Sequence, residues 1–204
     1  MATEVPAHAG LRELAVAAAR CTACELYERA TQTVFGAGPA KARVMLVGEQ
    51  PGDVEDRRGE PFVGPAGRML DRALDEAGLA RNEVYLTNAV KHFRWKSTAS
   101  SKRRIHQRPG ATHIAACHPW LDAEITAVRP RIVVAMGAVA AQSLLGSSFR
   151  LTQHRGELLD WPDPHTTVEA AVATIHPSAI LRAGEKRKEM QAGFVADLRL
   201  ASRV

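Results

Sequence analysis

Three cysteines have the spacing of metal ligands. Cys21 and Cys24 form the pair CTAC, whose two-residue gap lets both sulfurs face one metal centre. Cys117 supplies a third thiol, and an odd number of cysteines without a secretory signal argues against a disulfide framework. A fourth ligand is needed, and zinc or an iron-sulfur cluster would accept an imidazole in that position. The candidates for it are His92, His113 and His118.

A second stretch with residues that could do chemistry is SKRRIHQRPG, residues 101–110, in which His106 follows three basic residues. It has too few apolar residues for a core element, so we expect a basic surface loop. No acidic residue lies between Glu83 and Asp122, and this gap predicts a surface that neutralises phosphates. A solvated basic loop without a ligand is the alternative. The basic residues of this window are Lys91, Arg94, Lys96, Lys102, Arg103, Arg104 and Arg108.

Length and composition limit the class of protein. With 204 residues, of which 46% are hydrophobic, the chain suits one domain spanning residues 1–204 better than two. No apolar run approaches the roughly 20 residues that span a bilayer, and the N-terminal stretch lacks an apolar signal core. We therefore expect a cytoplasmic protein with no membrane contact. Nothing indicates an obligate dimer, so a monomer is expected.

Four short apolar runs, rich in β-branched residues and bounded by Gly, Pro or polar residues, predict buried strands. Segments with helical periodicity alternate with them. This alternation predicts a three-layer α/β/α sandwich around a central, mainly parallel four-stranded sheet. The expected strands are Arg43–Val47, Val84–Asn88, Arg131–Gly137 and Ala170–Pro177, and the expected helices are Leu11–Ala19, 67–79, 111–128, 137–146 and Lys186–Ser202.

Polar motifs follow three of the expected strands. GEQPGD, residues 48–53, follows the first strand, Asn88 and the basic segment follow the second, and HPSAILR, residues 176–182, follows the fourth. Open parallel sheets bind ligands beyond the carboxyl ends of their strands. These motifs therefore predict one shared pocket.

Four motifs, taken in order, resemble those of the iron-sulfur uracil-DNA glycosylases of family 4. They are GEQPGD, EPFVGPAGRMLD, TNAVKH and HPSAILR, and the resemblance runs from Cys21 to the C-terminal helix. This chain has Gln50 where the family has alanine, and it carries an insertion containing KRRIH. That combination resembles the UdgX branch, whose members cut at uracil and stay covalently joined to DNA through the loop histidine. The resemblance implies a bacterial, nucleoid-associated protein that acts on uracil-containing, preferably single-stranded DNA.

The resemblance also implies a cofactor. His92 stands where the family has its third cluster cysteine, and Cys117 stands where it has the fourth. A [4Fe-4S] cluster is then expected on Cys21, Cys24, His92 and Cys117.

Base recognition is expected from Phe62, Asn88 and His176, and Gln50 is a further expected contact to uracil. Phe62 would stack on an extruded pyrimidine. The Asn88 amide offers a donor and an acceptor, which match uracil and not cytosine. His176 would hydrogen-bond the departing base.

In this interpretation His106 bonds to the sugar in place of water, and Glu49 accepts its other ring N–H. Gln50 would brace the loop or the base, and Asp53 would position solvent. Two alternatives remain open: a conventional multiple-turnover glycosylase, and a non-catalytic metal-containing DNA-binding module. The residues expected to contact DNA are Lys102, Arg103, Arg104, Arg108, Ser178 and Arg182.

Overall fold

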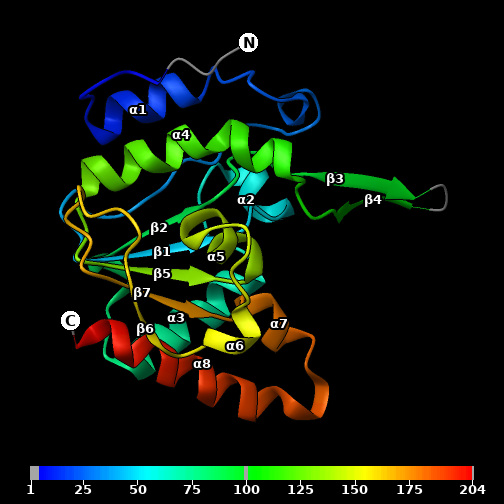
Figure 1. The fold of residues 1–204 in the computed structure, drawn as a ribbon. Coiled ribbons are helices and arrows are strands. Elements are labelled where there is room, and N and C mark those ends of the chain that lie inside the picture. Colours follow the sequence, from blue (N-terminus) through cyan, green and yellow to red (C-terminus); the bar gives the residue numbers. More distant parts are fainter. Residues whose placement is uncertain (1–4, 99–100, 204) are drawn as a thin grey trace.

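Four parallel strands form the centre of the sheet in the computed structural model of the protein (Figure 1), which describes residues 5–98 and 101–203, with the backbone alone of residues 101 and 102. The sheet order is β2-β1-β5-β7-β6, and only β6 runs antiparallel to its neighbour. Every residue of the four parallel strands is buried, as expected for a sheet covered on both faces. The strands are β1 (Val44–Gly48), β2 (Val84–Asn88), β5 (Ile132–Met136), β6 (Leu158–Asp160) and β7 (Ala170–Thr174).

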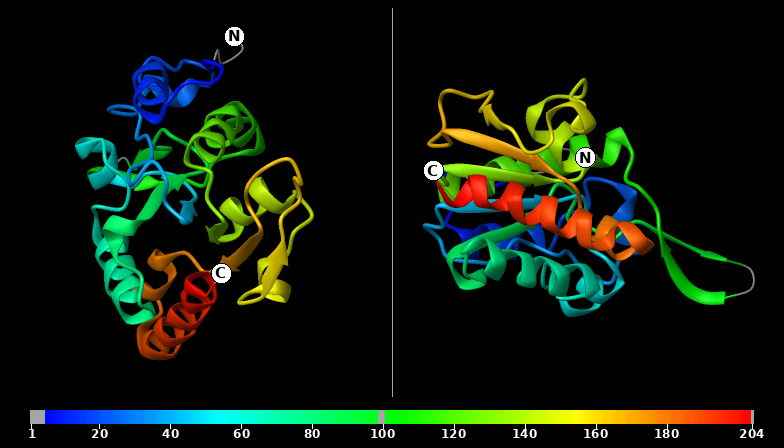
Figure 2. Two further views of the ribbon diagram at one scale, coloured as in Figure 1. Left: turned by 90° about the vertical axis from the view of Figure 1, so that its left-hand side faces the viewer. Right: turned by 90° about the horizontal axis from the view of Figure 1, so that it is seen from below.

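Helices cover both faces of this sheet (Figures 1 and 2). The helices α3 (Pro65–Ala77), α7 (Pro177–Leu181) and α8 (Arg187–Ser202) pack on one face. The helices α4 (Ala111–Val128) and α5 (Ala138–Leu145) pack on the other, and α1 (Leu11–Ala18) lies outside α4. The remaining helical segments are η1 (Glu25–Glu28), α2 (Asp53–Arg58), η2 (Arg81–Glu83), α6 (Leu151–His154) and η3 (Gly184–Lys186).

The predicted α/β/α sandwich is confirmed, with one correction to its sheet. The sheet has five strands instead of four, because β6 adds an antiparallel edge. This strand is only three residues long and two of the three are exposed, so it lacks the apolar run that marks the other strands. In the described ranges no helix is both long and apolar enough to span a membrane.

The basic stretch is a strand and not the expected loop. The strand β4 (Ser101–His106) pairs with β3 (Trp95–Thr98) as an antiparallel hairpin, in which Trp95 lies opposite His106. The hairpin forms a separate two-stranded sheet that projects from the body of the molecule (Figures 1 and 2). An isolated hairpin is marginally stable in water, so contacts with the body must hold it in place.

Arg104 supplies several of these contacts. Its side chain is 10% exposed, and its guanidinium forms ion pairs with Asp53 and Asp56 of α2. It also lies over the rings of Phe93 and Trp95, at 5.4 and 5.5 Å from their centroids. Asp56 is fully buried and accepts a further hydrogen bond from the Thr31 backbone N–H at 2.9 Å. The charged groups therefore fasten the hairpin to the start of α2.

Replacing this guanidinium tests the attachment. We expect Arg104→Ala to raise amide hydrogen exchange in β3 and β4 by about tenfold or more, since hydrogen bonds to charged groups contribute about 1.5–3 kcal/mol each. Lys96→Ala, at an exposed position of the same hairpin, is the matched control and should leave exchange unchanged. Equal exchange in both variants would show that other contacts hold the hairpin.

Candidate active site

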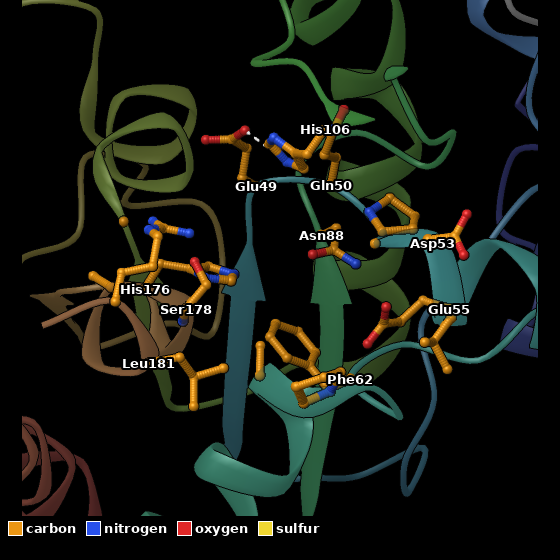
Figure 3. A pocket seen from close by; sticks show the side chains of 18 of the residues that line it. Glu49, Gln50, Asp53, Glu55, Phe62, Asn88, His106, His176, Ser178 and Leu181 are labelled. Atoms are coloured by element: carbon orange, nitrogen blue, oxygen red, sulfur yellow. Dashed lines mark hydrogen bonds and ion pairs between the residues drawn. The ribbon is translucent and has the colours of Figure 1, made fainter. Parts of the chain in front are cut away.

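One cavity of about 960 Å³ lies at the carboxyl ends of the parallel strands (Figure 3). It is bordered by the turn after β1, the end of β2, the hairpin and the segment after β7. The predicted residues that line it are Glu49, Gln50, Asp53, Phe62, Asn88, Arg103, Arg104, His106, His176, Ser178 and Arg182. Motifs that are far apart in the sequence thus meet in one pocket.

Phe62 forms one wall of this cavity in an unusual backbone conformation. Its φ angle is 55°, in the left-handed region that bulky residues rarely adopt, and its side chain is buried. Gly67 of α3 allows this conformation, because a Cβ there would collide with the Phe62 carbonyl. Strained residues of this kind persist where the surroundings hold them, often at functional sites. The ring centroid lies 6.0 Å from that of His176.

Asn88 ends β2 and points into the cavity (Figure 3). The parallel register places it beside Gly48, the last residue of β1. A Cβ on Gly48 would collide with the Asn88 side-chain oxygen and would lie 2.6 Å from the Phe62 ring. The absence of a side chain at residue 48 therefore leaves room for both groups.

The ring of His176 is held by the first turn of α7. Its Nδ1 accepts a hydrogen bond from the Ser178 backbone N–H at 3.2 Å, and the Ser178 hydroxyl lies 2.8 Å from the same nitrogen. A backbone N–H can only donate, so the neutral ring carries its hydrogen on Nε2. Burial lowers the pKa of His176 to about 4, and the nearby His106 and Arg182 act in the same direction. The ring is therefore a neutral donor at pH 7.

His106 is the last residue of β4 and lies beside Glu49 at the cavity (Figure 3). Its Nε2 lies 3.4 Å from Oε1 of Glu49, a buried oxygen that accepts no hydrogen bond within the described ranges. Burial raises the pKa of Glu49, although Arg108 and Arg182 oppose the shift. The side chain of His106 is 50% exposed, and its partial burial, helped by Arg182, lowers its pKa. An unprotonated imidazole beside a carboxylate of raised pKa is suited to nucleophilic chemistry.

Gln50 joins the turn after β1 to the base of the hairpin, where it contacts the residue before β3 and the residue after β4. Its amide nitrogen donates to the carbonyl oxygens of Arg94 and Gln107, at 3.2 and 3.1 Å, and its Oε1 accepts from the Arg94 backbone N–H at 3.1 Å. Both amide hydrogens are thus used by residues that flank β3 and β4. This geometry favours the expected bracing role, whereas a contact between Gln50 and uracil stays a prediction.

Asp53 and Arg104 also bind each other, so their polar groups are engaged inside the protein. Burial alone would raise the pKa of Asp53, but hydrogen bonds from Arg57 and Arg104 outweigh it and lower the pKa. The solvent role of Asp53 and the phosphate role of Arg104 stay predictions. Arg108 lies outside the cavity lining, with one guanidinium nitrogen 3.4 Å from the Gln142 side chain. The predicted contact of Lys102 falls on a side chain outside the described set.

The three cysteines gather near the start of α4. Cys24 packs with Cys117 in one apolar cluster, and Cys21 accepts a hydrogen bond from the Trp120 indole at 3.3 Å. Burial raises the pKa of Cys117 to about 11, and the thiols of Cys24 and Cys21 act in the same direction. His92 is buried, with Nε2 2.9 Å from the Thr33 hydroxyl.

As far as the structure describes the chain, no three His, Cys, Asp or Glu side chains are close enough to bind a single metal ion. The ligands of an iron-sulfur cluster bond to different irons, so they need not converge on one point. The three neighbouring thiols are therefore suited to hold a cluster. The Nδ1 of His92 is the ring nitrogen left for a fourth ligand bond while Nε2 keeps its hydrogen bond with Thr33.

Comparison with known proteins identifies the family. Residues 35–199 match the model of the uracil DNA glycosylase superfamily. The chain belongs to this superfamily. It is 36% identical to a type-4 uracil-DNA glycosylase of Thermotoga maritima, over 80% of this chain and 79% of that protein. It is 34% identical to the type-4 enzyme of Sulfurisphaera tokodaii, over 85% and 77%, and 32% identical to a type-5 enzyme of Pyrobaculum aerophilum, over 70% and 64%.

Sequence reasoning missed one carboxylate of this uracil-DNA glycosylase superfamily member. Glu55, in the first turn of α2, lines the cavity and is 8% exposed. Its Oε1 accepts a hydrogen bond from the Gly64 backbone N–H at 2.8 Å, which holds the loop that carries Phe62. Acidic residues are common in the first turn of a helix, so the sequence carries no signal that separates Glu55 from its neighbours.

The lowered pKa of His176 predicts a pH dependence of stability. Between the ordinary pKa of 6.5 and the value of about 4, the unfolded state binds more protons than the folded state. The contribution of His176 to the free energy of unfolding is therefore complete above pH 6.5, and it is lost as the pH falls towards 4. We expect urea unfolding of His176→Gln to show a smaller loss of stability across this range than the wild-type protein. Identical losses would contradict the assignment.

Proposed function

We propose that the protein excises uracil from single-stranded DNA and is then captured on the abasic sugar by His106, as a member of the UdgX branch. One observation carries the proposal: His106 enters the same cavity as Phe62, Asn88 and His176, with a carboxylate at 3.4 Å from its ring nitrogen. The membership in the superfamily supports the excision step. The proposed role is DNA repair or the shielding of uracil sites by a monomeric, single-domain protein of the bacterial nucleoid.

Phe62 and Asn88 would select the base. Stacking of a base on an aromatic ring typically contributes about 1–3 kcal/mol, and Phe62 lines the cavity that would receive an extruded pyrimidine. The Asn88 amide can donate to a uracil carbonyl and accept from its imide N–H, whereas cytosine presents the reverse pattern.

His176 would stabilise the leaving base. When the bond between the base nitrogen and C1′ breaks, its electron pair goes to the uracil, which becomes an anion. The Nε2–H of a neutral imidazole donates a hydrogen bond to that developing charge. Such a donor commonly lowers a barrier by about 3–4 kcal/mol.

His106 would then bond to the electron-deficient C1′. The lone pair of one unprotonated ring nitrogen forms the new C–N bond, while Glu49 accepts the proton from the other ring nitrogen. The raised pKa of Glu49 favours this transfer. Because a nitrogen on carbon is a poor leaving group for hydrolysis, the adduct persists and each protein molecule acts once.

Basic side chains at the rim would hold the DNA strand. Arg103 of β4 and Arg182 at the end of α7 line the cavity. Lys102, Arg108 and Ser178 are further proposed contacts. Binding through such phosphate contacts weakens as salt rises.

A [4Fe-4S] cluster on Cys21, Cys24, His92 and Cys117 is part of the proposal. The neighbouring thiols and the resemblance to iron-sulfur glycosylases support it. When bound, the cluster would tie the segment before β1 to α4 and to the turn after β2. We assign it no step in the reaction.

Metal analysis tests this cofactor. Protein purified without oxygen should contain about four irons and four sulfides per chain and absorb in the visible range. Cys117→Ala should lose the iron and the absorbance, because a central ligand is removed. Colourless wild-type protein with one zinc per chain would contradict the cluster.

The decisive experiment concerns the capture step. Mixing the protein with uracil-containing single-stranded DNA should give a heat-stable shifted band on a denaturing gel. We expect His106→Ser to lose this band, because serine cannot provide the imidazole, and to gain turnover if water enters the pocket. Digestion and mass spectrometry should find the sugar on the peptide that contains His106. A shifted band in His106→Ser would remove this residue from the covalent role.

A conventional multiple-turnover glycosylase is the second candidate, favoured by the type-4 enzymes among the relatives. Abasic product without a shifted band would support it. Neither product nor band would instead indicate a non-catalytic DNA-binding module.

A further inference from the structure

An ion pair is buried next to Asn88, outside the residues that line the cavity. Lys91 follows β2 and Glu124 belongs to α4, and their side chains are 1% and 0% exposed. A buried ion pair often stabilises a fold no better than apolar residues of similar volume. Its presence next to a proposed recognition residue therefore suggests a role in positioning.

The ammonium of Lys91 closes the turn that contains Asn88. Its Nζ donates to the Asn88 carbonyl oxygen at 2.7 Å and to the Thr87 hydroxyl at 2.8 Å, and it is paired with the Glu124 carboxylate. One side chain thus reaches back three and four residues along its own chain. The carbonyl group of Asn88 is held from inside the protein.

Glu124 fixes this turn relative to α4 and the sheet. Its Oε1 accepts hydrogen bonds from the Gly36 backbone N–H at 2.9 Å and the Tyr85 hydroxyl at 3.0 Å. The Thr87 hydroxyl lies 2.9 Å from Oε2. The carboxylate therefore gathers donors from β2 and from the segment before β1 around the ammonium of Lys91.

The side chain of Asn88 depends on this backbone arrangement. In the part of the chain that the structure describes, no hydrogen bond from another protein group to its amide is found, and the residue is 2% exposed. Packing over Gly48 limits its position. Its direction into the cavity is thus set by the backbone, which the pairing of β2 with β1 holds on one side and Lys91 holds at the Asn88 carbonyl.

We propose that Lys91 is a positioning residue for uracil recognition, acting through the backbone of Asn88 and held in place by Glu124. The inference rests on the proposed uracil excision. It implies that the buried charges serve base recognition and that DNA backbone binding does not need them.

The test uses Lys91→Met with Glu124→Gln in the same chain. Both charges are removed together, so no uncompensated charge is left buried, and the amide oxygen that replaces the carboxylate still accepts from Tyr85 and Gly36. We expect single-turnover uracil release to fall by about 10- to 100-fold, as for the loss of a hydrogen bond to a charged group. Binding to a strand with a tetrahydrofuran abasic analogue should stay within about twofold of wild type.

A double-mutant cycle separates positioning from general damage to the fold. In an Asn88→Ala background the two changes should lower release by no more than about twofold, because the group they position is already absent. Thr87→Val is a second variant that keeps both charges, and it should show a smaller loss with the same dependence on Asn88.

Wild-type uracil release by the folded double variant would overturn the role of Lys91. The same conclusion would follow if the double variant lowered the release rate as strongly in the Asn88→Ala background as in the wild-type background. A wild-type protein that releases no uracil would instead contradict the proposed function, so the two failures are distinguishable.

Discussion

The parallel pairing of β1 with β2 is the constraint on which the pocket depends. It sets Gly48 beside Asn88, so the two strand ends reach the same edge of the sheet. The turn after β1 then delivers Glu49 and Gln50, and the turn after β2 leads to the hairpin. A shift of one residue in this register would turn Asn88 towards the opposite face. Burial of every residue in both strands makes that shift costly.

Polar side-chain interactions position the hairpin of β3 and β4, which does not belong to the main sheet. Gln50 donates hydrogen bonds to the residues that flank the base of the hairpin, and Arg104 binds two carboxylates of α2. Both interactions hold the hairpin whose second strand ends in His106. A hairpin without a place in the main sheet can thus present one ring at a defined position. The desolvation of these polar groups is offset because each has a partner.

The central sheet could be predicted from sequence because its four parallel strands are continuous apolar runs ended by Gly, Pro or polar residues. Their observed bounds differ from the predicted ones by three residues at most. The edge strand β6 has no such run, and β4 is identified only by its pairing with β3. The residues that line the cavity could be predicted because strand ends meet at one edge. The partners in the buried ion pairs could not be predicted, because nothing local in the sequence indicates which distant charge a buried charge will meet. Examples are Asp56, which pairs with Arg104, and Glu124, which pairs with Lys91.

The ring of His176 receives its hydrogen bond from a peptide group and not only from the serine hydroxyl. Residue 178 can therefore vary during evolution without changing which ring nitrogen is protonated, provided that the replacement retains an amide hydrogen. Proline is the single amino acid that lacks one. The tautomer of this histidine is thus encoded in the backbone, and it is largely protected from mutation at the neighbouring position.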